Sequence, residues 1–234
     1  MSTPHFRKPV LEVIVCSVAD AVAAEAGGAH RLEVVSHFEA GGLTPAPGLV
    51  RELRAAVRLP LRVMVRESEG FAITERAERA RLCAAARDFA ALGVDGLVLG
   101  FLRGGGIDAG LLARVLACAP RTRATFHRAF EAARDPLATI ARLKAYPQID
   151  RILTGPGEGD WPERCARLAR YAAAARPEIE ILAGGGLDAA AIGELRAGAG
   201  LREFHVGRGA RAGGRVEGEV EAARVRQLVS AIGL

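Results

Sequence analysis

The sequence has little of what marks several protein classes. Lys8 and Lys144 are its only lysines, and aromatic residues make up 5% of the chain. No apolar stretch reaches the roughly 18 to 20 residues that a membrane-spanning helix needs. The other basic residues are arginines spread among acidic ones, without the interleaved aromatics typical of nucleic-acid binding. Despite a formal net charge of +5, we therefore expect neither a nucleic acid nor a membrane as partner.

The cysteines are few and widely separated. The chain has four, at positions 16, 83, 118 and 165, and none forms a CxxC pair. That spacing excludes a zinc module and a disulfide framework. It predicts a protein of the reducing cytoplasm.

What the chain does have is a globular composition and one repeating pattern. Hydrophobic residues make up 50% and charged residues 25% of 234 residues, which favours a single domain over residues 1–234. Short aliphatic runs alternate with Ala-, Arg- and Leu-rich helical stretches, at residues 11–15, 31–35, 61–65, 96–99, 123–126, 151–153, 180–182 and 203–206. Eight such β/α units predict an α/β fold of the (β/α)8 TIM barrel type.

Alternation within the strands predicts what fills the barrel, because successive side chains point to opposite faces. The evenly aliphatic positions of the first, third and fourth runs should pack against helices. The other positions then point inward, and those nearest the strand starts are charged: Glu12, Glu33, Arg62, Arg123, Arg151, Glu180 and Glu203. For the sixth run the opposite parity, with Ile152 and Thr154 inside, remains open.

The carboxyl ends of the strands are where barrels of this type carry their sites. Small residues there predict an open pocket, and the Gly-rich turns predict backbone donors for an anion. The candidate pocket residues are Arg66, His127, Arg128, Thr154, Gly184, Gly185, Gly186, Gly207 and Arg208. We interpret His127 as a proton-transfer residue of the pocket, because imidazole titrates near neutral pH. A core histidine bonded to a carboxylate is the alternative.

Three more polar residues point into the barrel below this level. Glu12 and Glu33, on neighbouring strands, are expected about 5 Å apart if the strands are in register. Paired carboxylates can serve acid/base chemistry, but arginines in the same layer favour a buried ion-pair cluster. His205 is expected beneath the pocket, as a hydrogen-bonded core residue or a supporting residue of the site.

Several segments resemble the CutC family, known as copper homeostasis proteins. They are LEVIVCSVADA (residues 11–21), GGAHRLEVVS (27–36), GGLTPAP (41–47), TFHRAF (125–130), RILT (151–154), AGGG (183–186) and EFH (203–205). TFHRAF and GGLTP are the most specific, and together the segments cover nearly the whole chain. The resemblance implies a (β/α)8 barrel, a cytoplasmic and often homo-oligomeric protein, and a link to copper without an established reaction.

The sequence departs from that family at its copper ligands and pocket rim. Relatives with a proposed Cu(I) site carry cysteines where this chain has Ile14 and Val35. Cys16 is the remaining candidate thiol, and it is only a weak candidate because Cu(I) prefers several soft ligands. Copper as a cofactor therefore rests on the resemblance alone. An Arg-Pro-Arg-Gly-Gly-Asp type of run is replaced by RESEG (residues 66–70), and the turns at Gly155-Pro156 and Val206-Gly207 differ as well.

These observations lead to one hypothesis with two rivals. The leading one is a CutC-like barrel that binds a small anionic metabolite. Arg66 and Arg128 would supply charge, residues 184–186 and 207–208 backbone donors, and His127 acid/base chemistry. The rivals are a non-catalytic Cu(I)-binding protein, and a structural role with a vestigial pocket.

Overall fold

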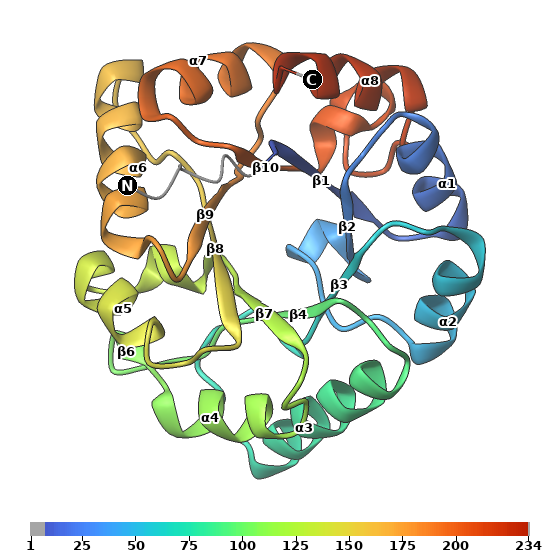
Figure 1. Ribbon diagram of the computed structural model, residues 1–234. Helices are drawn as coiled ribbons and strands as arrows, with labels where there is room; N and C mark the ends of the chain where they lie inside the picture. The colour runs from blue at the N-terminus through green and yellow to red at the C-terminus, as the bar shows by residue number, and fades with distance from the viewer. Residues whose placement is uncertain (1–7, 234) are drawn as a thin grey trace, which may run out of the picture.

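A closed barrel of parallel strands forms the centre of the protein. The computed structural model describes residues 8–233. Eight barrel strands pair in the order β1-β10-β9-β8-β7-β4-β3-β2, and eight α-helices surround them (Figure 1). The fold is therefore a (β/α)8 TIM barrel, as the alternating pattern predicts. No helix in this part of the chain combines the length and apolar character needed to cross a membrane.

The barrel elements follow the predicted runs within one or two residues at most ends. The strands of the barrel are β1 (Val10–Val15), β2 (Arg31–Val34), β3 (Leu61–Met64), β4 (Gly96–Leu99), β7 (Arg123–Phe126), β8 (Ile149–Thr154), β9 (Glu180–Ala183) and β10 (Glu203–Val206). The helices are α1 (Val18–Ala26), α2 (Pro47–Ala56), α3 (Arg76–Ala91), α4 (Ala109–Ala117), α5 (Pro136–Leu143), α6 (Trp161–Ala175), α7 (Ala189–Ala199) and α8 (Ala222–Ala231).

Smaller elements occupy the loops. They are the 3₁₀ turns η1 (Phe38–Ala40), η2 (Arg128–Ala132), η3 (Arg208–Ala210) and η4 (Ala212–Gly214), and the short hairpin β5 (Leu102–Arg103) and β6 (Gly106–Ile107). Three of the turns, η1, η2 and η3, directly follow or closely follow the carboxyl ends of barrel strands. They bring their side chains over the end of the barrel where a site is expected.

Side-chain caps start most of the helices. The residue before the first turn accepts a backbone N–H bond with its side-chain oxygen at Ser17, Asp108, Asp135, Asp160 and Asp188. Each such cap stabilises its helix by about 0.5–2 kcal/mol. The caps define where the chain turns from loop to helix, and so hold the loop lengths at the strand ends.

The main hydrophobic core lies between the strands and the helices. The aliphatic residues of β1 and β3 that were predicted to face outward, such as Leu11, Val13 and Leu61, have no exposed surface and belong to this core. Ile152 belongs to it as well, which settles the parity of β8: Arg151 and Leu153 point inward. Each buried aliphatic side chain contributes about 1.5–3 kcal/mol relative to an exposed one.

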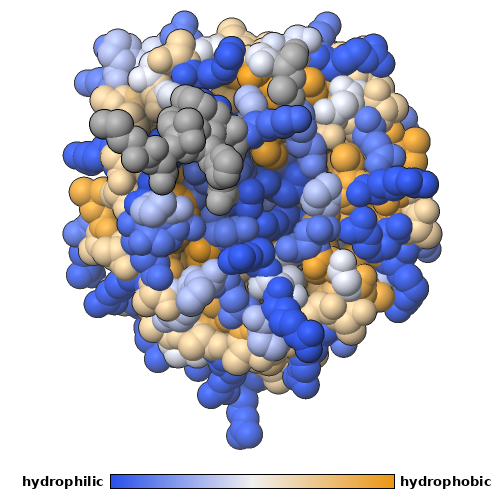
Figure 2. All heavy atoms as spheres, viewed as in Figure 1, coloured by the Kyte–Doolittle hydropathy of each residue, from blue (hydrophilic) through white to orange (hydrophobic). Residues whose placement is uncertain are grey.

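The interior of the barrel has a small apolar layer and much polar surface. Ile14, Val35, Met64 and Val98 form a separate buried cluster inside the barrel. Figure 2, which looks along the barrel, shows hydrophilic residues gathered over the centre of the viewed face. The hydrophobic stabilisation of the fold therefore comes chiefly from outside the barrel, and the inside is left to polar chemistry.

The register of the strands corrects the predicted charged layer. Glu12 pairs with Arg31 across β1 and β2, and Glu33 pairs with Ile14. Closing a barrel requires the strands to be staggered, so residues at equal positions along neighbouring strands do not share a level. Glu33 consequently lies one inward position above Glu12.

Two members of that layer do not take part in it. The side chain of Arg123 is exposed and donates to the carbonyl of Pro147. Glu180 is half-buried and pairs with Arg176 at 3.6 Å. Both predictions were wrong because the sequence pattern gives the parity of a strand but not its vertical offset in the barrel.

Candidate functional site

A cavity of about 710 Å³ opens inside the barrel toward the carboxyl ends of the strands. Its polar lining combines three arginines with two histidines and two glutamates, and its apolar lining includes two phenylalanines. The polar lining residues are Glu33, Arg66, His127, Arg128, Glu131, His205 and Arg208. The large apolar ones are Ile14, Phe38, Met64, Phe71 and Leu153. Mixed apolar walls with a few convergent polar groups are typical of small-molecule sites.

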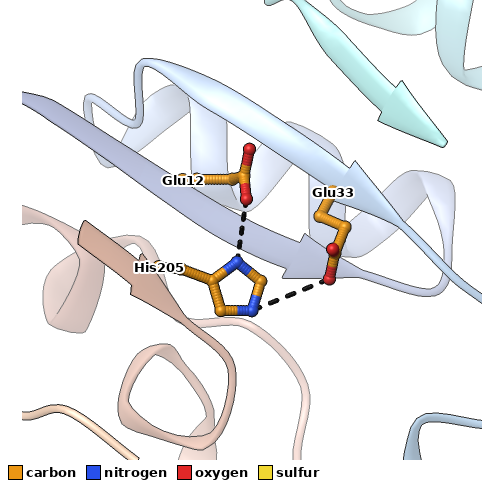
Figure 3. A group of neighbouring side chains, drawn as sticks. All are labelled: Glu12, Glu33 and His205. Carbon is orange, nitrogen blue, oxygen red and sulfur yellow. Dashed lines mark hydrogen bonds and ion pairs between the residues drawn. The ribbon is translucent and has the colours of Figure 1, made fainter. Parts of the chain in front are cut away.

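Glu12, His205 and Glu33 form a chain of side chains at the floor of the cavity. Figure 3 shows the ring of His205, from β10, between the two carboxylates of β1 and β2. Nδ1 of His205 lies 2.8 Å from Oε1 of Glu12, and Nε2 lies 3.7 Å from Oε2 of Glu33. Glu33 and His205 line the cavity, while Glu12 has no exposed surface. The prediction that all three lie beneath the pocket therefore holds for Glu12 only.

Beneath this floor lies an inner ion-pair network of Glu12, Arg31, Arg62, Asp150, Arg151 and Glu203. Arg31 bonds Glu12 and also lies 3.0 Å from Glu203. Arg151 joins Glu203 and Asp150, at 2.6 Å each, and Asp150 accepts two hydrogen bonds from Arg62. Three carboxylates thus meet three guanidinium groups, and the network is formally neutral. It confirms the ion-pair interpretation for Glu12 but not for Glu33.

The floor carboxylates have opposite acidities. Burial alone would raise the pKa of Glu12, but Arg31 and His205 outweigh it and hold that pKa well below its usual range. Burial raises the pKa of Glu33 to about 7, with Glu12 adding to the effect and His205 opposing it. Burial would lower the pKa of His205, but the two carboxylates raise it. The surroundings therefore favour the ionised form of Glu12 and the protonated form of His205, and burial favours the protonated form of Glu33.

The same three residues offer ligand atoms that all lie within 4.8 Å of one another. Each ring nitrogen of His205, however, faces a different carboxylate, and Glu12 is already bonded to Arg31. An imidazole presents only one nitrogen to a given metal ion, so the carboxylates on its two sides would not converge on that ion. His205 therefore links the two carboxylates, through a hydrogen bond to Glu12 and a longer ion-pair contact to Glu33.

His127 lies in the cavity wall at the end of β7, as predicted, but its environment favours another role. Nδ1 accepts the backbone N–H of Ala129 at 3.1 Å, which leaves the proton on Nε2. Nε2 is buried and has no hydrogen-bond partner among residues 8–233. Burial and the nearby Arg66 lower the pKa of His127 to about 3. The ring is therefore neutral at pH 7 and offers a fixed N–H donor instead of an exchangeable proton.

The arginines around the cavity differ in how far they are neutralised. Arg128 is paired with Glu131, at 2.7 Å. Arg66 donates to the carbonyls of Ala40, Gly41, Gly42 and Glu69 and packs over Phe71, without a carboxylate partner in the described part of the chain. Arg208 is exposed and has no ion-pair partner there either. In the described chain, the charges of Arg66 and Arg208 are therefore not balanced by an ion pair, although the terminal nitrogens of Arg66 are bonded to backbone carbonyls.

Backbone groups complete this side of the cavity. Gly185 and Gly186 line it with φ angles of +93° and +79°, a conformation that suits glycine alone. Their N–H groups donate to no other described residue. Gly207 lines the cavity as well, and a Cβ there would lie 2.4 Å from the ring of Phe38. Gly185, Gly186 and Gly207 thus lie at the cavity, and the anion contacts expected of their turns stay a prediction.

Two predicted pocket residues lie elsewhere. Gly184 does not line the cavity, and its N–H donates to the carbonyl of Thr154. Thr154 points outward from β8 into a side cavity of about 430 Å³ with Arg164 and Arg167. The prediction failed for Thr154 because the parity of β8 could not be fixed from its sequence.

The positions of the family's copper ligands offer no donor atoms here. Ile14 and Val35 lie together in the apolar cluster inside the barrel, and Cys16 packs beside it. The Cys16 thiol is half-buried, 3.7 Å from the guanidinium of Arg211, and does not line the cavity. Burial raises its pKa to about 11, which keeps it protonated, whereas Cu(I) binds thiolate. These residues do not fit a Cu(I) site.

Besides Asp150 of the inner ion-pair network, the pattern of the sequence missed two further polar residues. Arg31 lies at the first position of β2 and shares the inward face with Glu33, so the parity rule could have included it. Glu131 lies in η2, where it bonds Arg128 and accepts the N–H of Gly155 at 2.7 Å. No strand or helix periodicity marks such a turn residue.

Comparison with known proteins agrees with this architecture. The family model described as "CutC family" matches residues 9–210. A CutC family protein of Xylella fastidiosa is 35% identical over 196 residues, which cover 83% of this chain and 73% of that protein. A human protein named as a copper homeostasis protein CutC homologue is 34% identical over 197 residues, 84% of this chain and 72% of that one.

Solved structures show the same fold. A copper homeostasis protein CutC from Streptococcus agalactiae superposes with a TM-score of 0.77 at 24% identity, covering 85% of this chain and 98% of that one. A phosphoribosyl anthranilate isomerase from Thermococcus kodakaraensis gives 0.63 at 15% identity, covering 96% and 99%. On the family match and the sequence identities, this chain belongs to the CutC family.

Proposed function

We propose that the protein binds a small anionic metabolite in the central cavity. The observation that carries this proposal is the pair of arginines, Arg66 and Arg208, that line one cavity without carboxylate partners in the described chain. The unused N–H groups of Gly185 and Gly186 lie on the same side. Guanidinium and backbone N–H groups together are typical ligands of carboxylate and phosphate oxygens.

The charge below the cavity supports the same proposal. The inner ion-pair network is formally neutral, so it does not cancel the field of the rim arginines. Glu33 and His205 add no net charge when they share one proton between them. Arg66 and Arg208 therefore add positive charge to the cavity wall, and positive charge in a cleft attracts anions from solution.

Copper handling, which the names of the relatives indicate for those proteins, has less support in this chain. It requires soft ligands, and the two thiol positions of the family are apolar here. The four free cysteines and the lack of any disulfide among them agree with the further proposal that the protein works in the cytoplasm. Assembly into a homo-oligomer stays a prediction.

The binding proposal is tested by calorimetric titration with inorganic phosphate and with dihydroxyacetone phosphate. We expect both to bind the parent protein, and Arg208→Gln and Arg66→Gln to weaken binding about 10- to 100-fold, as the loss of a charge-assisted hydrogen bond predicts. Arg51→Gln is the matched control, because Arg51 is an exposed arginine of α2 far from the cavity lining. Equal affinities in all four proteins, or no binding to the parent, would refute the proposal.

A further inference from the structure

Glu33 has an unusual position for a carboxylate. Its side chain is 3% exposed, and it lines the cavity beside Ile14 and Met64. Its Oε2 faces His205, and its Oε1 has no hydrogen-bond partner among residues 8–233. A buried carboxylate oxygen without a donor is destabilised unless a ligand or a proton reaches it. The free oxygen therefore marks a place where a bound molecule would make contact.

The charged groups that act on Glu33 come from three strands. They are Glu12 on β1, Arg31 on β2 itself, and His205 on β10. Arg62 on β3 lies opposite Glu33 in the strand register, but its two terminal guanidinium nitrogens are bonded to Asp150 instead. His205 is thus the nearest cation that can balance Glu33, and Glu12 fixes the ring that supplies it.

His127 supplies a complementary group on another part of the wall. It is a neutral imidazole whose Nε2–H is buried and lacks an acceptor in the described chain. Both it and Glu33 line the same cavity, one at the end of β7 and the other on β2. A bound carbonyl oxygen would satisfy the free N–H, and a preorganised donor of this kind stabilises negative charge that develops on that oxygen.

We propose that the cavity catalyses reversible proton removal from a carbon atom next to a carbonyl group of a small anionic substrate. Glu33 is the base, His127 binds the carbonyl oxygen, and Arg66 and Arg208 hold the anionic group. His205 is a positioning residue that acts through Glu33. This inference rests on the proposed function, because Arg66 and Arg208 must bind the anionic group before Glu33 can remove the proton.

The step is balanced without any co-reactant. The C–H bond breaks, its proton passes to Oε1 of Glu33, and its electron pair forms a C=C bond. The electrons of the carbonyl π bond move to the oxygen, where the Nε2–H of His127 stabilises the enolate. Glu33 then returns the proton to the same carbon or to its neighbour, which gives exchange, epimerisation or isomerisation as the overall reaction class.

The test follows deuterium incorporation into dihydroxyacetone phosphate in D2O by ¹H NMR. We expect the parent protein to accelerate exchange at the carbon next to the carbonyl, and Glu33→Gln to lower the rate about 100-fold or more, the usual contribution of a general base. Calorimetric affinity for the same probe should change little in Glu33→Gln. Glu52→Gln, an exposed glutamate of α2, is the matched control and should exchange like the parent.

The outcomes separate the two proposals. Binding of the probe without exchange above the buffer rate overturns the catalytic inference and leaves the binding proposal standing. Exchange that survives in Glu33→Gln overturns the assignment of the base. Failure of the probe to bind the parent overturns both. Circular dichroism and thermal unfolding of Glu33→Gln show whether a lost rate comes from a lost fold.

The role of His205 has its own readout. Exchange needs ionised Glu33, so its rate should rise with pH through the pKa of Glu33, which burial raises to about 7. The charge of His205 lowers the pKa of Glu33. His205→Gln should therefore raise that pKa and move the midpoint of the pH–rate profile to higher pH. A merely structural role would lower the rate at every pH and leave the midpoint in place.

Discussion

Removing Arg31 should destabilise the protein far more than removing a surface arginine. Arg31 is 6% exposed and bonds two buried carboxylates, Glu12 with 0% and Glu203 with 5% of the side chain exposed. Arg31→Met keeps most of the volume but leaves the inner ion-pair network with one more anion than cations. Glu203 retains Arg151, and Glu12 retains only His205.

The size of the effect follows from that geometry. At an effective dielectric constant of about 20, two unit charges about 3 Å apart attract by roughly 5 kcal/mol. Partial hydration returns some of this, and measured losses for one partner of a buried pair are about 3–5 kcal/mol. Against a total stability of about 5–15 kcal/mol, such a loss is a large fraction.

The assay is urea unfolding followed by circular dichroism at neutral pH, with Arg224→Met as the control. Arg224 pairs with Glu221 at the surface, with 39% and 48% of the side chains exposed, and should contribute less than about 1 kcal/mol. The double variant Arg31→Met/Glu12→Gln should regain part of the loss, because the uncompensated anion is gone. A loss in Arg31→Met no larger than in Arg224→Met would refute the reasoning.

Three further predictions concern acidity, packing and copper. The folded-state pKa values of Glu12, Asp150 and Glu203 are lowered, so the stability they give is present above their unfolded values, 4.5 for Glu and 3.8 for Asp, and is lost as pH falls through the lower folded values. The free energy of unfolding should drop steeply below about pH 4, and less steeply in Glu203→Gln; parallel curves for both proteins would contradict this. Gly207→Ala places a Cβ 2.4 Å from Phe38 and 2.9 Å from Ile14, which should cost about 1–3 kcal/mol in thermal unfolding and weaken phosphate binding, whereas Gly48→Ala, with nothing within 4 Å, should do neither. An anaerobic Cu(I) titration against a chromophoric chelator should show no stoichiometric binding in the parent or in Cys16→Ala, and a gain in Ile14→Cys/Val35→Cys; tight binding in the parent that Cys16→Ala abolishes would instead favour copper as the ligand.

The sequence was sufficient for the fold and for the direction of most strand side chains. Alternation predicted the eight β/α units and the outward aliphatic sets, and the charged inward positions predicted ion pairs inside the barrel. Register was not predictable, because the stagger of a barrel depends on how all strands close together. That is why Glu12 and Glu33, alike in sequence context, have different neighbours and opposite acidities.

The sequence predicted where the pocket residues lie, but it did not predict the chemical role of each residue. The strand-end rule located His127, Arg66 and the glycine turns. The low pKa of His127 depends on burial by Phe71 and on Arg66, which approach from other parts of the chain. Asp150 has the outward parity of Ile152, but the register between β7 and β8 shifts at this point, with Ala124 opposite Ile149 and Thr125 opposite Arg151. The pattern of the sequence does not predict such an irregularity.

The inner ion-pair network also limits how molecules can pass through the barrel. Its side chains occupy the amino end of the barrel, and within residues 8–233 the cavity lining gathers at the carboxyl ends of the strands, where we expect ligands to enter and leave. A molecule bound at Glu33 would therefore pass Arg66 and Arg208 both when it enters the cavity and when it leaves. If a reaction here used two partners, the one that reacts at the floor would have to enter first and leave last, and steady-state kinetics would show a compulsory order.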